Sequence, residues 1–182
     1  MKKIIARFVL YLLGMKLVQP NSYPKKYVIA VVPHTSNWDF PLGVAVRALM
    51  DENVSFVAKD SLFGWPHGFI FRWLGGVPVD RSKRNNFVQS VADVFDKNDN
   101  FKVVLAPEGT RSKVTQLKSG FYYIAKTAGV PILLCAFDWG NHQVRFAPPF
   151  YPTDDKEKDF EHIYAFFSGA IGCIPENGFS NN

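Results

Sequence analysis

The fold of this chain is decided by one stretch, YVIAVVPHTSNWD at residues 27–39. Residues 27–32 are apolar and mostly β-branched, which predicts a short buried strand. Pro33 has no N–H to give to a sheet ladder, so we expect the strand to end there. Residues 40–50 follow as a predicted helix. Pro41 is compatible with this helix, because proline is tolerated in the first turn. His34 and Asp39 are therefore expected on a strand-to-helix loop, at the edge where open α/β sheets bind ligands.

A histidine close to a carboxylate is typical of general-base catalysis, because the carboxylate fixes the imidazole tautomer and stabilises the imidazolium. A structural interpretation is also open for both residues. Asp39 precedes a predicted helix, where aspartate is a common N-cap, and His34 can be an ordinary loop histidine. The chain has four His and many acidic residues, so one His-x-x-x-x-Asp spacing does not by itself decide between them.

Length and composition predict one globular domain with a sizeable core, since the chain has 182 residues, 47% of them hydrophobic and 20% charged. The formal net charge is +5. The excess of basic over acidic residues is concentrated before the first predicted strand, where the chain has no acidic residue. The basic residues there are Lys2, Lys3, Arg7, Lys16, Lys25 and Lys26. This pattern favours an anionic partner, either a phospholipid surface or an acidic carrier protein. Nucleic acid is disfavoured because no nucleic-acid-binding signature is present.

The two cysteines, Cys135 and Cys173, indicate neither a disulfide framework nor a zinc site, and they are compatible with a reducing compartment. Cys135 lies within an apolar run and is expected to be a buried small hydrophobic residue. His34 and Asp39 could also be metal ligands, but no third and fourth ligand accompany them. We therefore expect no metal.

Residues 4–18 form an apolar stretch that is too short for a comfortable membrane span of about 20 residues. Its apolar residues recur at helical spacing behind the basic residues at the start of the chain. One interpretation is an amphipathic helix over residues 1–20 that lies in the membrane interface, separate from a domain over residues 21–182. The other is a helix packed on the core. The first interpretation predicts a cytoplasmic protein attached peripherally to the inner face of the cell membrane.

A second apolar segment, residues 62–74, contains five aromatic residues, more than one helix face can bury. These side chains could line an acyl-chain pocket, lie at a lipid headgroup interface or form ordinary core.

The remaining pattern alternates strands and helices, which predicts a single-domain α/β fold with a mixed, mostly parallel sheet and helices on both faces. Further strands are expected at residues 54–58, 77–79, 102–106, 130–137 and 144–146, and helices at 85–97, 119–128 and 155–173. Lys59, Arg81 and residues 108–111 come directly after predicted strands. They are therefore expected near His34, at one edge of the sheet.

The segment Glu108-Gly109-Thr110-Arg111 is suited to binding a phosphate. Gly109 lets a ligand approach the backbone, Thr110 offers a hydroxyl, and Arg111 offers a planar fork of donors. The structural alternative is a turn that carries a Glu–Arg ion pair.

Four stretches, at residues 34–39, 76–81, 107–112 and 129–132, resemble in order the motifs of the lysophospholipid (1-acylglycerol-3-phosphate, PlsC-like) acyltransferases. The resemblance implies an α/β fold and acyl transfer from a CoA or acyl-carrier-protein thioester to a lipid hydroxyl, with no other cofactor. The departures are Pro33, where the family often has Asn, and Ala106, where it often has an aromatic residue. By this resemblance His34 is the base and Asp39 its partner, and the acceptor phosphate site comprises Lys59, Arg81, Glu108, Gly109, Thr110 and Arg111.

The expected mechanism is direct attack, in which His34 takes the proton of the acceptor hydroxyl as that oxygen attacks the thioester. The default acceptor is 1-acylglycerol-3-phosphate. Backbone N–H groups at the start of the following helix are candidate donors to the thioester oxyanion. Two other functions stay open: a thioesterase-like hydrolase that activates water, and a lipid-binding protein on the membrane surface without turnover.

Overall fold

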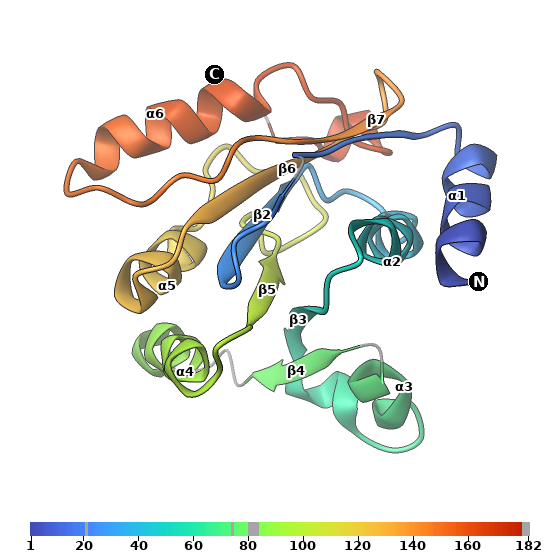
Figure 1. Cartoon of the computed structure of the whole chain (residues 1–182). Helices are drawn as coiled ribbons and strands as arrows, with labels where there is room; N and C mark the ends of the chain where they lie inside the picture. Colours follow the sequence, from blue (N-terminus) through green and yellow to red (C-terminus); the bar gives the residue numbers. More distant parts are fainter. Residues whose placement is uncertain (21, 74, 80–83, 180–182) are drawn as a thin grey trace.

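The computed structural model of the chain describes residues 1–20, 22–73, 75–79 and 84–179, which form one sheet with helices on both faces (Figure 1). The strands are β1 (Lys16–Val18), β2 (Tyr27–Val32), β3 (Val54–Lys59), β4 (Gly76–Val79), β5 (Lys102–Leu105), β6 (Ile132–Asp138) and β7 (Gln143–Phe146). The α-helices are α1 (Lys2–Leu12), α2 (Asp39–Met50), α3 (Gly68–Trp73), α4 (Arg84–Lys97), α5 (Gly120–Ala128) and α6 (Lys156–Phe167). Two 3-10 turns, η1 (Asp60–Phe63) and η2 (Pro175–Asn177), complete the described elements.

The sheet has the strand order β1-β7-β6-β2-β5-β3-β4. Neighbouring strands are parallel except β6 and β7, which are antiparallel. The predicted fold class, an α/β domain with a mixed and mostly parallel sheet, is therefore confirmed. Strand β2 lies at the centre, between β5 and β6, so the loop that follows it is surrounded by other strand ends.

Every residue of β2 is buried, because helices cover both faces of the sheet. Val28, Ala30 and Val32 pack into a core with residues of α4, α5 and α6. The alternate residues of β2 pack into a second core with α1 and α2, which also contains Cys135. Cys135 is buried, as its apolar surroundings in the sequence predicted.

The first helix is shorter than the segment 1–20 that the sequence suggested, since α1 ends at Leu12. Gly14 follows with a positive φ of 65°, a conformation that ends helices. Residues 16–18 then form β1, which pairs in parallel with β7 and so belongs to the sheet. The expected helix over residues 1–20 was therefore wrong, and Gly14 is the physical reason.

Helix α1 packs on the core with one side, and its place in a membrane interface stays a prediction. Ala6 and Leu10 are buried in the core that α1 shares with α2. The other side of the helix exposes large apolar side chains, namely Ile4, Ile5, Phe8, Tyr11 and Leu12. Among the described residues, no helix is both long enough and apolar enough to cross a membrane.

Helix α6 also ends earlier than the predicted range of 155–173. It stops at Phe167, because Ser168 has an extended backbone and Gly169 a positive φ of 76°. The chain then turns back towards the loop after β2. There the N–H of Ile174 donates to Thr35 Oγ1 at 3.1 Å.

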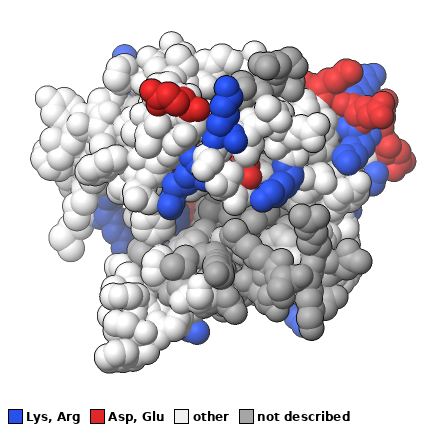
Figure 2. All heavy atoms as spheres, turned by 180° about the vertical axis from the view of Figure 1, so that it is seen from behind, with Lys and Arg blue, Asp and Glu red and all other residues white. Residues whose placement is uncertain are grey.

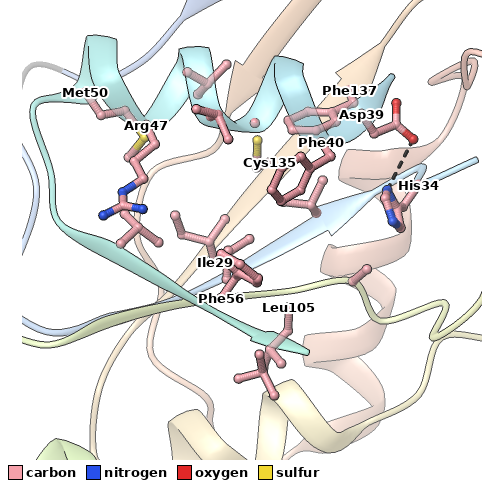
Figure 3. Close-up of a pocket in the computed structure, with 18 of the residues that line it drawn as sticks. Ile29, His34, Asp39, Phe40, Arg47, Met50, Phe56, Leu105, Cys135 and Phe137 are labelled. Atoms are coloured by element: carbon pink, nitrogen blue, oxygen red, sulfur yellow. Dashed lines mark ion pairs between the residues drawn. The ribbon is translucent and has the colours of Figure 1, made fainter. Parts of the chain in front are cut away.

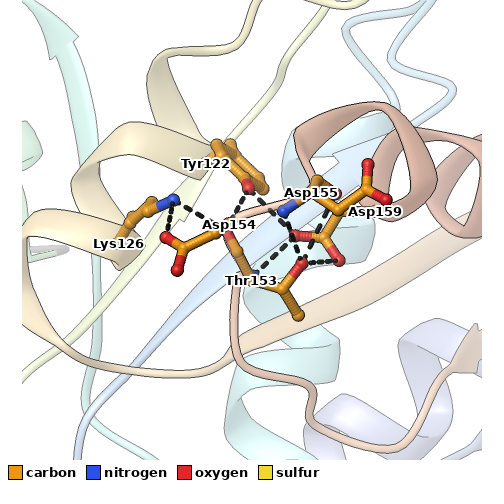
Figure 4. A network of polar contacts seen from close by, with 6 residues as sticks. All are labelled: Tyr122, Lys126, Thr153, Asp154, Asp155 and Asp159. Atoms are coloured by element: carbon orange, nitrogen blue, oxygen red, sulfur yellow. Dashed lines mark hydrogen bonds and ion pairs between the residues drawn. The ribbon is translucent and has the colours of Figure 1, made fainter.

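A polar cluster joins α5 to α6 and to the segment before it, with Tyr122 and Asp159 as its buried members (Figure 4). Tyr122 Oη lies 2.9 Å from Asp159 Oδ2 and 3.0 Å from the Thr153 carbonyl, so its single proton is shared between these two acceptors, and the Thr153 N–H donates to the same carboxylate at 2.7 Å. Asp159 is thus buried with its hydrogen-bonding capacity used, which stabilises this corner of the fold.

Candidate active site

Parallel pairing brings the carboxyl ends of four strands, β2, β5, β3 and β4, to one edge of the sheet. The predicted site residues after these strands share that edge where the structure describes them. Lys59 is the last residue of β3, but its side chain lies outside the described part of the structure. Arg81 lies outside the described residues altogether.

The structure brings His34 and Asp39 into contact, with Nδ1 of His34 3.2 Å from Oδ2 of Asp39. The same carboxylate oxygen accepts the N–H groups of Thr35 at 2.8 Å and Ser36 at 2.9 Å. Asp39 is the first residue of α2, and Trp38 occupies the N-cap position. The expectation that Asp39 caps the helix was therefore wrong, because its side chain turns back into the loop that carries His34.

Trp139 is a contact of Asp39 that the sequence analysis missed. Its indole Nε1–H donates to Oδ1 of Asp39 at 2.9 Å, and its backbone N–H donates to the Ile171 carbonyl at 2.8 Å. The available signal was its position directly after β6, which runs parallel to β2 and ends at the same edge.

Asp39 is only 2% exposed, yet its donors keep it ionised. Burial pushes the pKa of Asp39 upward, but hydrogen bonds from His34, Ser36 and Trp139 outweigh burial and hold that pKa below its usual value. A carboxylate so placed holds a proton on Nδ1 of His34, which leaves Nε2 as the basic nitrogen.

Glu108 approaches His34 from the other side and is 1% exposed. Its Oε2 accepts the backbone N–H of His34 at 2.6 Å, while Oε1 is buried and has no partner among the described residues. Burial raises the pKa of Glu108 to about 7. Glu108 therefore supports the loop of His34, and its part in shaping the acceptor phosphate site stays a prediction.

The segment after Glu108 turns its cationic side chains outward. Arg111 is exposed while Glu108 is buried, and no ion pair between them occurs in the described structure, so the predicted alternative of a Glu–Arg pair was wrong. Gly109 has a positive φ of 66°, and the Lys118 side chain lies over it where a Cβ would otherwise stand. Thr110 Oγ1 accepts the Ser112 N–H at 3.2 Å, within the same loop.

Lys118 is a second cation at this loop that the sequence analysis did not single out. Its backbone N–H donates to the Pro107 carbonyl at 2.9 Å, which ties the start of α5 to the residue before Glu108. The molecule carries several Lys and Arg side chains close to a small recessed acidic group on the face shown in Figure 2. A surface of this kind suits an anionic ligand.

An apolar cavity of about 220 Å³ lies between α2 and the sheet (Figure 3). His34 and Asp39 line one end, and Arg47 and Met50 line the other, about 16 Å away along the helix at 1.5 Å per residue. Its walls are largely aliphatic and aromatic side chains of α2, β2, β3, β5 and β6. Such a cavity accepts an extended hydrocarbon chain whose end lies beside His34.

The aromatic segment at residues 62–74 does not supply this cavity, since none of its described residues line it. Phe63 is buried, whereas Trp65, Phe69 and Trp73 are strongly exposed. The predicted acyl-pocket role of this segment is therefore not supported, and its tip is not ordinary core.

The backbone donors near His34 are already engaged. Thr35 and Ser36 donate to Asp39, Trp38 donates to Ser36 Oγ at 3.2 Å, and the N–H groups of Asp39 and Phe40 donate to carbonyls within the loop. These five groups are thus not free for a thioester oxyanion. Within the described residues, no group of three or more His, Cys, Asp and Glu is arranged to hold a metal ion.

Comparison with known proteins gives one family match, in which the family described as Acyltransferase covers residues 15–138. A 1-acyl-sn-glycerol-3-phosphate acyltransferase from Cocos nucifera is 24% identical over 199 aligned positions, which cover 96% of this chain. The chain spans 63% of the length of that relative.

Among solved structures, the 1-acyl-sn-glycerophosphate (LPA) acyltransferase PlsC from Thermotoga maritima superposes with a TM-score of 0.63. The match covers 91% of this chain and 74% of the other, at 19% sequence identity. At this identity, the likeness demonstrates a shared fold.

Proposed function

The chain belongs to the acyltransferase family, and from this premise we propose that it moves a fatty acyl group from a thioester to a lipid hydroxyl. The donor is an acyl-CoA or an acyl-carrier protein, and the default acceptor is 1-acylglycerol-3-phosphate. The observation that carries the proposal is the His34–Asp39 contact at one end of an apolar cavity. The name of the Cocos nucifera relative supports the choice of acceptor.

In the proposed mechanism, Nε2 of His34 takes the proton of the acceptor hydroxyl as that oxygen attacks the thioester carbonyl. The tetrahedral intermediate collapses with cleavage of the C–S bond, and His34 returns the proton to the leaving thiolate. Asp39 holds the productive tautomer and stabilises the imidazolium, help that typically contributes about 10²–10⁴-fold. Glu108 and Trp139 act indirectly, by fixing the His34 backbone and the Asp39 carboxylate.

Substrates fit the two sides of the site by their chemistry. The acyl chain enters the apolar cavity beneath α2. The acceptor phosphate binds the cationic loop after β5, where Arg111 supplies a fork of donors and Lys118 a second charge. Lys59 and Arg81 are assigned to the same phosphate by family resemblance.

The decisive experiment is acyl transfer from labelled acyl-CoA and acyl-carrier protein to a panel of lysophospholipids, glycerol phosphate and acylated amino-acid lipids. Wild type should form the ester, and His34→Ala should lose at least about 10²-fold in rate. His162→Ala, an exposed histidine on α6, is the matched control and should retain activity. Free acid released regardless of acceptor would assign a hydrolase, and lipid binding without product would assign a binding protein.

We further propose that α1 attaches the protein to the inner, anionic face of the cytoplasmic membrane. Its exposed side presents large apolar residues, and Lys2, Lys3 and Arg7 supply positive charge on the same short helix. The double variant Ile4→Ser with Phe8→Ser should reduce cosedimentation with anionic vesicles and leave β1 intact. Replacing the basic residues should reduce binding more at low salt than at high salt. Unchanged sedimentation of both variants would contradict an interfacial α1.

A further inference from the structure

A second exposed apolar surface lies on the segment between β3 and β4, and we call it the α3 surface. It consists of Trp65, Phe69 and Trp73, which are 97%, 71% and 83% exposed. Large apolar side chains at this density are uncommon on a free surface and mark a site of interaction.

Contacts within residues 63–72 hold the backbone beneath the α3 surface in place. Phe63 is buried, the Gly68 N–H donates to the Gly64 carbonyl at 2.8 Å, and Arg72 donates to the Phe63 carbonyl at 2.9 Å. The Arg72 guanidinium also lies over the Phe63 ring, 5.4 Å from its centroid. The exposed side chains therefore project from a segment that its own contacts fix in place.

Helices α1 and α3 lie on the same side of the molecule, to the right of strands β2 and β5 in Figure 1. Both approach the C-terminal end of α2. Lys3 at the start of α1 pairs with Asp51 at 2.9 Å, and a Cβ on Gly75, just after α3, would lie 3.0 Å from the Arg47 guanidinium. Arg47 also lines the far end of the cavity beneath α2. Helices α1 and α3 thus flank the cavity end that is remote from His34.

The charge of this part of the sequence matches an anionic surface. By sequence, residues 60–84 hold four Lys and Arg residues and two acidic residues, a net charge of +2. Tryptophan is favoured at the membrane–water interface, where its ring contacts acyl chains and its N–H contacts headgroups. A phospholipid bilayer with anionic headgroups satisfies both properties.

From these observations we infer that the α3 surface is a second bilayer contact, which together with α1 fixes the orientation of the protein on the membrane. In that orientation the remote end of the cavity faces the lipid. The inference rests on the proposed function for its purpose, but the contact itself is independent of turnover.

The test measures binding of the full chain to phosphatidylcholine–phosphatidylglycerol vesicles, with and without brominated acyl chains that quench tryptophan. The double variant Trp65→Ser with Trp73→Ser should bind on the order of 10- to 100-fold more weakly, as expected when two buried aromatic contacts are lost. Tyr151→Ser removes an exposed aromatic on the loop between β7 and α6 and should bind like wild type.

A second variant keeps the apolar character and removes the two tryptophan fluorophores of the α3 surface, so that only Trp38 and Trp139 remain. Trp65→Phe with Trp73→Phe should still bind vesicles but should lose most of the quenching by brominated lipid. Retained quenching in this variant, or wild-type binding by the serine variant, overturns the inference. So does concentration-dependent self-association that the serine variant abolishes, because the surface then belongs to a second copy of the chain.

Failure of this inference is distinguishable from failure of the proposed function. Vesicle binding is measured without substrates, whereas the proposed reaction is tested by turnover of wild type on detergent-dispersed substrates. Equal circular dichroism spectra of the variants exclude loss of folding as the cause of weaker binding.

Discussion

The loop after β2 and the loop after β5 each bring one buried carboxyl close to His34. The pKa values of these two carboxyls are shifted in opposite directions. Asp39, after β2, has two backbone N–H donors, the Trp139 indole and the His34 ring around it. Glu108, after β5, accepts one N–H and leaves its other oxygen without a partner among the described residues. Burial is nearly equal, so the number of donors decides the outcome: the pKa of Asp39 is lowered and that of Glu108 is raised to about 7.

The difference indicates a division of roles at one strand edge. The loop after β2 keeps a permanent negative charge beside the base. The loop after β5 holds a carboxyl that titrates near neutral pH and presents cations to solvent. Substitutions that change donor number or charge in either loop test this division.

The largest effect is expected for Asp39→Asn. An amide that donates to Nδ1 of His34 favours the wrong tautomer, so Nε2 ceases to be a base, and kcat should fall about 10²–10⁴-fold, or about 3–5 kcal/mol. The acceptor KM should change little. Steady-state kinetics check this, with Asp96→Asn on α4 as the exposed control. Near-normal kcat in Asp39→Asn would remove the distinction between the two loops.

Glu108→Gln should change the pH dependence of stability. Below about pH 4.5 the Glu108 carboxyl is protonated in both the folded and the unfolded chain. As the pH rises towards 7, the carboxyl loses its proton in the unfolded chain first, because its pKa is raised in the folded chain. Above pH 7 this difference lowers the free energy of unfolding by about 3 kcal/mol. The glutamine variant should lack this loss. Urea unfolding at pH 5 and pH 8 measures it, with exposed Glu161→Gln as control. Identical pH dependence in wild type and Glu108→Gln would contradict the raised pKa.

Trp139→Phe keeps the ring and removes one donor from Asp39. A hydrogen bond to a charged group contributes about 1.5–3 kcal/mol, so we expect kcat to fall on the order of tenfold while KM is kept. Trp38→Phe, an exposed tryptophan beside the same loop, should have a smaller effect. A rise in KM with unchanged kcat would assign Trp139 to substrate binding instead of positioning.

Arg111→Lys should have the smallest effect, because the charge stays and only the fork of donors is lost. The acceptor KM should rise about fivefold, equivalent to about 1 kcal/mol, while the donor KM stays the same. Lys158→Arg on α6 controls for exchange of one cation for another at a remote site. An equal rise of both KM values would show that Arg111 does not serve the acceptor phosphate.

The sequence predicted what local pattern controls. The β-branched run at residues 27–32 became β2, and the apolar run around Cys135 became β6. The alternation of strands with helices predicted the parallel sheet, and this in turn predicted that residues after the strands would meet at one edge. His34, Asp39 and Glu108 were identified in this way.

Contacts between distant parts of the chain could not be predicted from one sequence. The Trp139–Asp39 bond joins residues 100 positions apart; the place of Trp139 directly after β6 indicates the shared sheet edge, but nothing in the sequence indicates the bond itself. The helix ends were wrong for a different reason. Apolar spacing continues past Leu12 and past Phe167, but Gly14 and Gly169 adopt positive φ and stop the helices.

The hydrogen bond from the Ile174 N–H to Thr35 joins residues 139 positions apart, so it cannot form until the ribosome has added Ile174. At about 5–20 residues per second, a ribosome adds the intervening residues in roughly 7 to 28 s. During that time the nascent chain already carries His34 and Asp39, but the segment that covers their loop does not yet exist. The hydrogen bond to this loop therefore forms only late in translation, after Ile174 has been added.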